Sequence, residues 1–243
     1  MSTISTNLFT PTPFAPPSVL PLEDGDHMSV AELLRRWDAL PEAWKAEHTR
    51  VELIEGVVRI MPPISGGSHA EPHFDFVAFL GVYRWATPGV HGGGPASIIF
   101  SDKTMPEPDA FLALDPKCGG NVRFDEKGYI HGPPELLAEI SSSSVSFDLH
   151  TKKELYRKFD VQEYVVWRVK ERAVDWFILR GDQYELLPAA DGIYRSEAFP
   201  GLWLAAAALV AGNFAQVSQV LQRGLASPEH RAFVERLQKP TPS

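Results

Sequence analysis

An apolar run with a single carboxylate inside it constrains the fold of this chain most strongly. Residues 136–140 read Leu-Leu-Ala-Glu-Ile, a pattern that favours a buried strand interrupted only by Glu139. A helix is predicted over Asp148–Phe159, and a second apolar run follows at Glu163–Val169. Strand, helix and strand in this order form a βαβ-like unit, so we expect a mixed sheet with helices packed against it.

The rest of the chain alternates helical and extended patterns around this unit. Before it we predict helices over 28–40 and 68–85, a strand pair over 50–61, and strands over 96–100 and 110–114. After it we predict a hairpin over 173–179 and 183–187 and helical structure over 205–237, while residues 115–132 look like a long loop. The predicted fold class is α/β in the broad sense, an α+β mixed sheet whose strand order the pattern leaves open.

Composition divides the chain into three parts. Residues 1–27 are rich in Pro, Ser and Thr and lack apolar periodicity, which predicts a mobile tail. Residues 28–209 carry the periodic patterns and are expected to form one domain, and residues 210–243 a C-terminal helix and tail. With 44% hydrophobic residues, the chain can bury a substantial core.

Charge and cysteine content exclude several classes of protein. No apolar run reaches the roughly 18 residues of a membrane span, and the first residues lack the basic and apolar regions of a signal peptide. Cys118 is the only cysteine, which excludes an intrachain disulfide and a cysteine-based zinc site, so we expect a cytoplasmic protein. The net charge of −8 argues against a protein that coats nucleic acid through bulk electrostatics.

Three residues on consecutive elements form a candidate site. Asp109 follows a proline and opens the strand at 110–114, Glu139 lies in the apolar strand, and Lys152 lies about one turn inside the next helix. Two carboxylates can hold a divalent cation, which acidifies water and polarises a phosphate. A lysine can orient that water and stabilise the charge that develops on the phosphate.

Each residue also has a simpler interpretation. Asp109 could be a turn residue, and Glu139 could form a structural ion pair with an Arg or Lys. Lys152 could be a solvated helix lysine, or pair on the surface with Asp148 four residues earlier. The pattern alone leaves these alternatives open.

The order of several motifs resembles the Uma-two family. These motifs are Pro108-Asp109, the segment from Pro134 to Ser142, the segment from Asp148 to Tyr156, and Val161-Gln162-Glu163-Tyr164. Weaker echoes are Val51 to Gly56, Ser68-His69 at a helix start, and Ser196 to Leu204. The resemblance covers roughly Met28 to Leu209. The chain departs from the family at Ser141–Ser146, which lacks the usual proline, and at Val165, where a tryptophan is expected.

The resemblance implies a PD-(D/E)XK, restriction-endonuclease-like core with flanking helices, and an active trio of Asp109, Glu139 and Lys152. In this family the lysine comes from the helix rather than from the strand position two residues after the glutamate, which is Ser141 here. The metal would be Mg²⁺, with Mn²⁺ as an alternative, held by Asp109, Glu139 and the backbone carbonyl of Ile140. Glu52 would be an accessory acid or, with equal weight, a strand-end ion pair. His69 is matched too, although capping and packing explain it as well.

The function expected from this resemblance is Mg²⁺-dependent hydrolysis of DNA phosphodiester bonds. DNA would be the partner, no membrane is involved, and a homodimer would suit the two strands of a duplex. Two other functions stay open: a non-catalytic interaction protein that retains the nuclease fold, and a hydrolase of a small phosphoester.

Overall fold

The computed structural model describes residues 21–48, 50–61 and 66–239. Its α-helices are α1 (Val30–Ala39), α2 (Glu42–Glu47), α3 (Glu71–Ala86), α4 (Val145–Phe147), α5 (Lys153–Lys158), α6 (Ala206–Val210), α7 (Phe214–Leu225) and α8 (Pro228–Leu237). Gly66–Ala70 and Asp148–Lys152 are π-helical turns, and Pro116–Cys118 is a 3₁₀ turn.

The strands of the described residues form one sheet of six strands, one of three and two of two. They are β1 (Val51–Ile54), β2 (Val57–Ile60), β3 (Val90–Gly93), β4 (Ile98–Ile99), β5 (Ala110–Leu114), β6 (Arg123–Phe124), β7 (Ile130–His131), β8 (Leu136–Ser141), β9 (Glu163–Arg168), β10 (Ala173–Arg180), β11 (Gln183–Leu186), β12 (Ile193–Arg195) and β13 (Trp203–Ala205). The central sheet has the strand order β11-β10-β9-β8-β5-β3. Only β8 and β9 pair in parallel in it, across the helical segment that ends in α5. The predicted mixed sheet and its βαβ unit are therefore confirmed.

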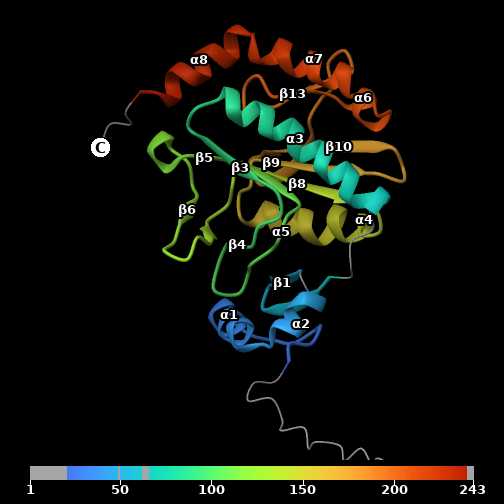
Figure 1. The fold of residues 1–243 in the computed structure, drawn as a ribbon. Coiled ribbons are helices and arrows are strands. Elements are labelled where there is room, and N and C mark those ends of the chain that lie inside the picture. Colours follow the sequence, from blue (N-terminus) through green and yellow to red (C-terminus); the bar gives the residue numbers. More distant parts are fainter. Residues whose placement is uncertain (1–20, 49, 62–65, 240–243) are drawn as a thin grey trace, which may run out of the picture.

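The two faces of the central sheet bury different residues because side chains alternate along each strand. One face packs against α3, α6, α7 and α8, with Leu112, Ala138 and Val165 among its sheet residues. The other face packs against α5 and includes Phe111, Leu137 and Val166. Figure 1 shows α3, α7 and α8 on one side of the sheet and α5 on the other.

The predicted strand pair at 50–61 is a hairpin that lies at one end of the molecule with α1 and α2 (Figure 1). Its turn residues Glu55 and Gly56 both have positive φ, 51° and 85°, as a two-residue hairpin turn requires. α1 packs on the hairpin in a separate cluster that includes Leu33, Leu53 and Met105. This small unit brings β1 to the edge of the face that α5 covers.

The structure corrects three sequence predictions. Residues 115–132 are not a plain loop, because β6 and β7 pair there and join β4 in a three-stranded sheet. The strand predicted at 96–100 shortens to β4, and β3, β12 and β13 were missed. All of these strands have two to four residues, too few for a periodic pattern to be recognised.

Both ends of the described part pack against the rest of the chain. Of the tail predicted at 1–27, residues 1–20 lie outside the described part, but Leu22 is buried and His27 bridges to Val57. At the other end, α7 and α8 belong to the main core rather than to a separate C-terminal segment. α7 approaches the chain near β13 so closely that a Cβ on Gly224 would lie 2.2 Å from the carbonyl oxygen of Gly201.

Candidate active site

Asp109 and Glu139 lie side by side on the face of the sheet that α5 covers. β5 and β8 are antiparallel with Ala110 opposite Ala138, so one step further along the ladder Asp109 stands opposite Glu139. Directly opposed residues point to the same face, with Cβ atoms about 4.5–5.5 Å apart. Both carboxylates are buried, with 2% and 3% of their surface exposed. The expected convergence is present.

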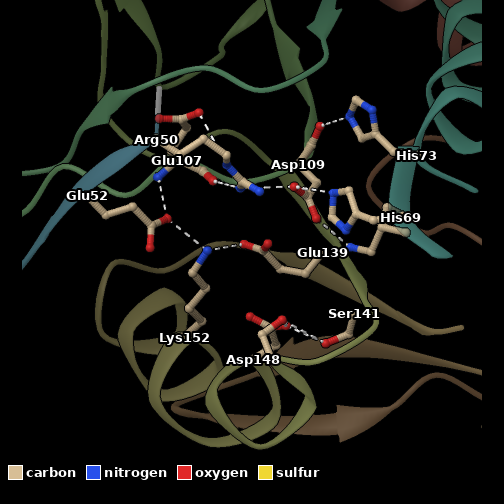
Figure 2. Close-up of polar contacts among 12 residues, drawn as sticks. Arg50, Glu52, His69, His73, Glu107, Asp109, Glu139, Ser141, Asp148 and Lys152 are labelled. Atoms are coloured by element: carbon tan, nitrogen blue, oxygen red, sulfur yellow. Dashed lines mark hydrogen bonds and ion pairs between the residues drawn. The ribbon is translucent and has the colours of Figure 1, made fainter. Parts of the chain in front are cut away.

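Lys152 reaches this pair from the π-helical turn that precedes α5. Its ammonium lies 2.9 Å from Glu139 Oε1 and 2.8 Å from Glu52 Oε1, and the residue is 1% exposed (Figure 2). The next residue, Lys153, points elsewhere and places its ammonium 3.7 Å from the centre of the Phe177 ring. Neighbouring helix residues differ by about 100° in direction, so only one of the two lysines can face the carboxylates.

Glu52 enters the site from β1 of the hairpin. Its Oε1 accepts hydrogen bonds from Lys152 and from the backbone N–H of Glu107, while its Oε2 is buried with no hydrogen-bond partner. The four side chains predicted for the site therefore lie together in the structure: Glu52, Asp109, Glu139 and Lys152. Ile140 participates through its backbone N–H, which donates to Asp109 Oδ2 at 2.7 Å.

Asp109 is held by side chains from two segments that are distant in sequence. Arg50 Nη2 lies 3.1 Å from Asp109 Oδ1, and His69 Nε2 lies 3.4 Å from the same atom. His73 contacts the backbone oxygen of Asp109 at 2.7 Å and stacks on His69 with ring centres 5.9 Å apart. Figure 2 shows the two histidines on the side of Asp109 opposite Lys152. His69 thus faces the site, whatever capping role it has.

Three residues of this cluster were not predicted: Arg50, His73 and Glu107. Arg50 Nε lies 3.6 Å from Glu107 Oε1, so the guanidinium bridges Glu107 and Asp109. Arg50 is 59 residues from Asp109 in sequence, a separation that no local pattern reveals. Glu107 could have been predicted from the sequence, because it is a carboxylate only two residues before Asp109 in the same segment.

Three comparisons with known proteins bear on this geometry. A family model described as "Uma2: Putative restriction endonuclease" matches residues 32–207, which is most of the chain and includes every residue of the cluster. The chain belongs to the Uma2 family. No curated protein matches it.

A solved structure agrees with this assignment at the level of the fold. It is the crystal structure of a protein from Anabaena variabilis ATCC 29413 that is described as a putative nuclease. The two chains are 19% identical, the match covers 79% of this chain and 98% of that chain, and the TM-score is 0.51. Among the described residues, no helix has the length and apolar character needed to cross a membrane.

The simpler interpretations can now be compared with the structure of this Uma2 chain. Lys152 is not a solvated helix lysine, and Asp148 does not pair with it on the surface, because both residues are buried. Asp148 instead accepts hydrogen bonds from Ser144 at 2.6 Å and from Ser141, and so ties the Ser-rich loop to the π turn. The ion-pair interpretation of Glu139 matches a contact that is present, and it does not conflict with a catalytic role.

The cluster carries more negative than positive charge. Glu52, Glu107, Asp109 and Glu139 face Arg50 and Lys152, four carboxylates against two cations. When all are ionised, the formal charge is −2. Buried charge that lacks a counter-charge is costly, so the site favours either protons or an added cation.

The pKa values of the cluster reflect this surplus. Burial raises the pKa of Glu107 to about 7 and that of Glu139 well above its usual range. Burial acts in the same direction on Asp109, but the hydrogen bond from His69 and the charge of Arg50 outweigh it and lower its pKa. The charges of Glu139 and Glu52 raise the pKa of Lys152 in spite of burial, so this lysine stays protonated.

The donor chemistry of the cluster fits a divalent cation. Mg²⁺ and Mn²⁺ prefer carboxylate oxygens, and the unpartnered Glu52 Oε2 is one such donor already buried beside Lys152. The arrangement is not that of a preformed metal site, since no three His, Cys, Asp or Glu side chains in the described part of the chain are placed to hold an ion together. Ion pairs occupy the carboxylates and would have to open for an ion to enter.

Proposed function

We propose that this Uma2 chain is a metal-dependent nuclease that hydrolyses phosphodiester bonds of DNA. The observation that carries the proposal is the meeting of Glu52, Asp109, Glu139 and Lys152 in one buried cluster that has a surplus of negative charge. These are the parts that hydrolysis at phosphorus requires, and family membership supports the same class of activity.

The carboxylates would hold Mg²⁺, with Mn²⁺ as a substitute, and the backbone carbonyl of Ile140 would complete the ligand set with Asp109 and Glu139. A bound divalent ion would supply an acidified water and polarise an oxygen of the phosphate. Glu52, whose Oε1 contacts Lys152, would add negative charge to the site. Arg50 would keep Asp109 ionised and oriented.

Lys152 would act on the reacting groups themselves. Its ammonium is protonated and buried between two carboxylates, so it can donate hydrogen bonds without losing its charge. With the carboxylates engaged in holding a metal, the Lys152 ammonium would orient the attacking water and stabilise charge that builds on the phosphate. Interactions of this kind contribute about 10²–10³ in rate.

A non-catalytic role as an interaction protein is the second candidate. It is favoured by the ion pairs that already occupy the carboxylates and by the net charge of −8, which gives nucleic acid little bulk attraction. In that case the cluster would be a structural network, and neither a divalent ion nor DNA would affect it.

Nicking of supercoiled plasmid tests the proposal. Wild-type protein in Mg²⁺ should yield open-circular DNA, and chelation with EDTA should prevent this. Glu139→Ala should abolish nicking, whereas Glu185→Ala, a matched loss of an exposed glutamate from strand β11, should leave it unchanged. Equal nicking by wild type and Glu139→Ala, or nicking that persists in EDTA, would reject the proposed role of this site.

A further inference from the structure

A pocket beside the carboxylate cluster has no part in the proposed chemistry. It has a volume of about 120 Å³ and is lined by Leu33, Leu34, Trp37, Val51, Ser97, Met105, Glu107 and Tyr129. About 10–15 Å³ of such space is the minimum that admits one water, so the pocket admits a ligand much larger than a water. That room suits a planar ring system.

The pocket is assembled from segments that are distant in sequence. Helix α1 supplies Leu33, Leu34 and Trp37, strand β1 supplies Val51, and the loop between β6 and β7 supplies Tyr129. Leu34, Trp37, Ser97 and Tyr129 are partly exposed, so the pocket opens to solvent. It is therefore a site that a ligand can enter from outside.

The lining combines apolar walls with a small number of polar groups. Trp37 and Tyr129 offer aromatic rings, and Leu34, Val51 and Met105 offer aliphatic contact. The polar groups are the hydroxyls of Ser97 and Tyr129 and the carboxyl of Glu107. The Glu107 carboxyl contacts Arg50 at 3.6 Å and also lines the pocket, so a flat heterocycle with an amino group would match both the apolar walls and this acceptor.

The carboxyl also connects the pocket to the candidate active site. Glu107 lies two residues before Asp109, so their Cα atoms are at most about 7 Å apart. Arg50 contacts both side chains, at 3.6 Å for Glu107 and 3.1 Å for Asp109. The distance between a group held in the pocket and a phosphate held at Asp109 and Glu139 is therefore one that a single sugar can span.

We propose that this pocket binds one nucleobase of the substrate strand, with the ring against Trp37 and its exocyclic amino group donating to Glu107. The proposal rests on the proposed function for the identity of the substrate. Carboxylates accept hydrogen bonds from the exocyclic amino group of cytosine, and adenine and guanine present similar donors, whereas thymine has none. The nuclease would therefore disfavour thymine at one position beside the cleaved bond.

Nucleosides test the pocket without phosphate, metal or cleavage. Full-length protein with ¹⁵N-labelled tryptophan is titrated in EDTA with deoxycytidine, deoxyadenosine or thymidine, and the indole signal of Trp37 is assigned by its loss in Trp37→Leu. The first two nucleosides should shift the Trp37 signal, and thymidine should do so at least fivefold more weakly. The signal of Trp85, which is 78% exposed on α3, should stay in place as a matched control.

Two variants distinguish a loss of binding in the pocket from a general loss of folding. Leu34→Phe fills the pocket and keeps an apolar residue, and Glu107→Gln keeps the shape while it removes the carboxylate. Leu34→Phe should weaken deoxycytidine binding at least tenfold, and Glu107→Gln should erase the preference over thymidine, with circular dichroism unchanged. No shift of Trp37 in the wild type, or equal shifts in wild type and Leu34→Phe, would overturn the proposal. Nucleoside binding without plasmid nicking would retain the pocket and reject the nuclease, whereas nicking without binding would do the reverse.

Discussion

The two faces of the central sheet differ in how they bury polar and charged side chains. The face under α3, α7 and α8 is mostly apolar, and its buried polar groups are matched. Glu163 accepts hydrogen bonds there from Trp176, Ser196 and two backbone N–H groups, and Thr87 contacts His230 at 3.0 Å. The face under α5 buries a cluster of carboxylates with fewer cations than it needs. The first arrangement favours stability, whereas the second gives up stability for groups that, under the proposed function, would bind a cation and a phosphate.

The largest effect on stability is expected on the apolar face. Phe199 is fully buried there and contacts Tyr83 and Phe233 edge-on. Phe199→Ala should lower the free energy of unfolding by about 3–5 kcal/mol, because it removes buried apolar surface and leaves a cavity. Urea unfolding followed by circular dichroism measures this. A loss below about 1 kcal/mol would show that this face is less tightly packed than described.

The charged face should instead show a dependence on pH. The pKa of Glu107 is about 7 in the folded state against 4.5 for the free group, so the folded protein binds this proton more tightly. Its stabilising contribution is present below pH 4.5 and is lost as the pH rises through about 7. In EDTA, this carboxyl should account for a loss of about 2 kcal/mol between pH 5.5 and 8.5.

Glu107→Gln tests this assignment, because glutamine resembles the protonated acid. The variant should lose about 2 kcal/mol less than the wild type over the same pH range, measured by urea unfolding. Phe199→Ala is the control, since it should lower stability by a similar amount at every pH. If Glu107→Gln and wild type have equal pH slopes, the carboxyl is not held in the environment described.

The smallest effect concerns the polar pair of the apolar face. Thr87 Oγ1 donates to the backbone oxygen of Tyr83 at 2.8 Å and contacts His230. Thr87→Val keeps the shape but removes the hydroxyl, so it should cost about 1 kcal/mol in unfolding free energy with no effect on plasmid nicking. A change in nicking would indicate that the two faces are coupled.

The same contrast explains what the sequence could predict. Runs such as Leu136–Ile140 repeat a pattern that burial imposes, so the central strands and the βαβ unit were found. Lys152 was identified by resemblance to a family motif. Arg50 and His73 have no local signature, because their roles depend on contacts across 59 and 36 residues. β3 was missed because two of its four residues are glycine, which is depleted in strands.

The central claim is that the buried cluster is a catalytic site in which Lys152 acts on the phosphate. Single-turnover cleavage of duplex DNA in Mg²⁺ tests it most directly, with Lys152→Ala beside its neighbour Lys153→Ala and folding checked by circular dichroism. Lys152→Ala should lower the rate about 10²–10³-fold, and Lys153→Ala, which removes only a contact with Phe177, should retain most of it. Equal losses in the two folded variants, or a loss in Lys153→Ala alone, would contradict the claim.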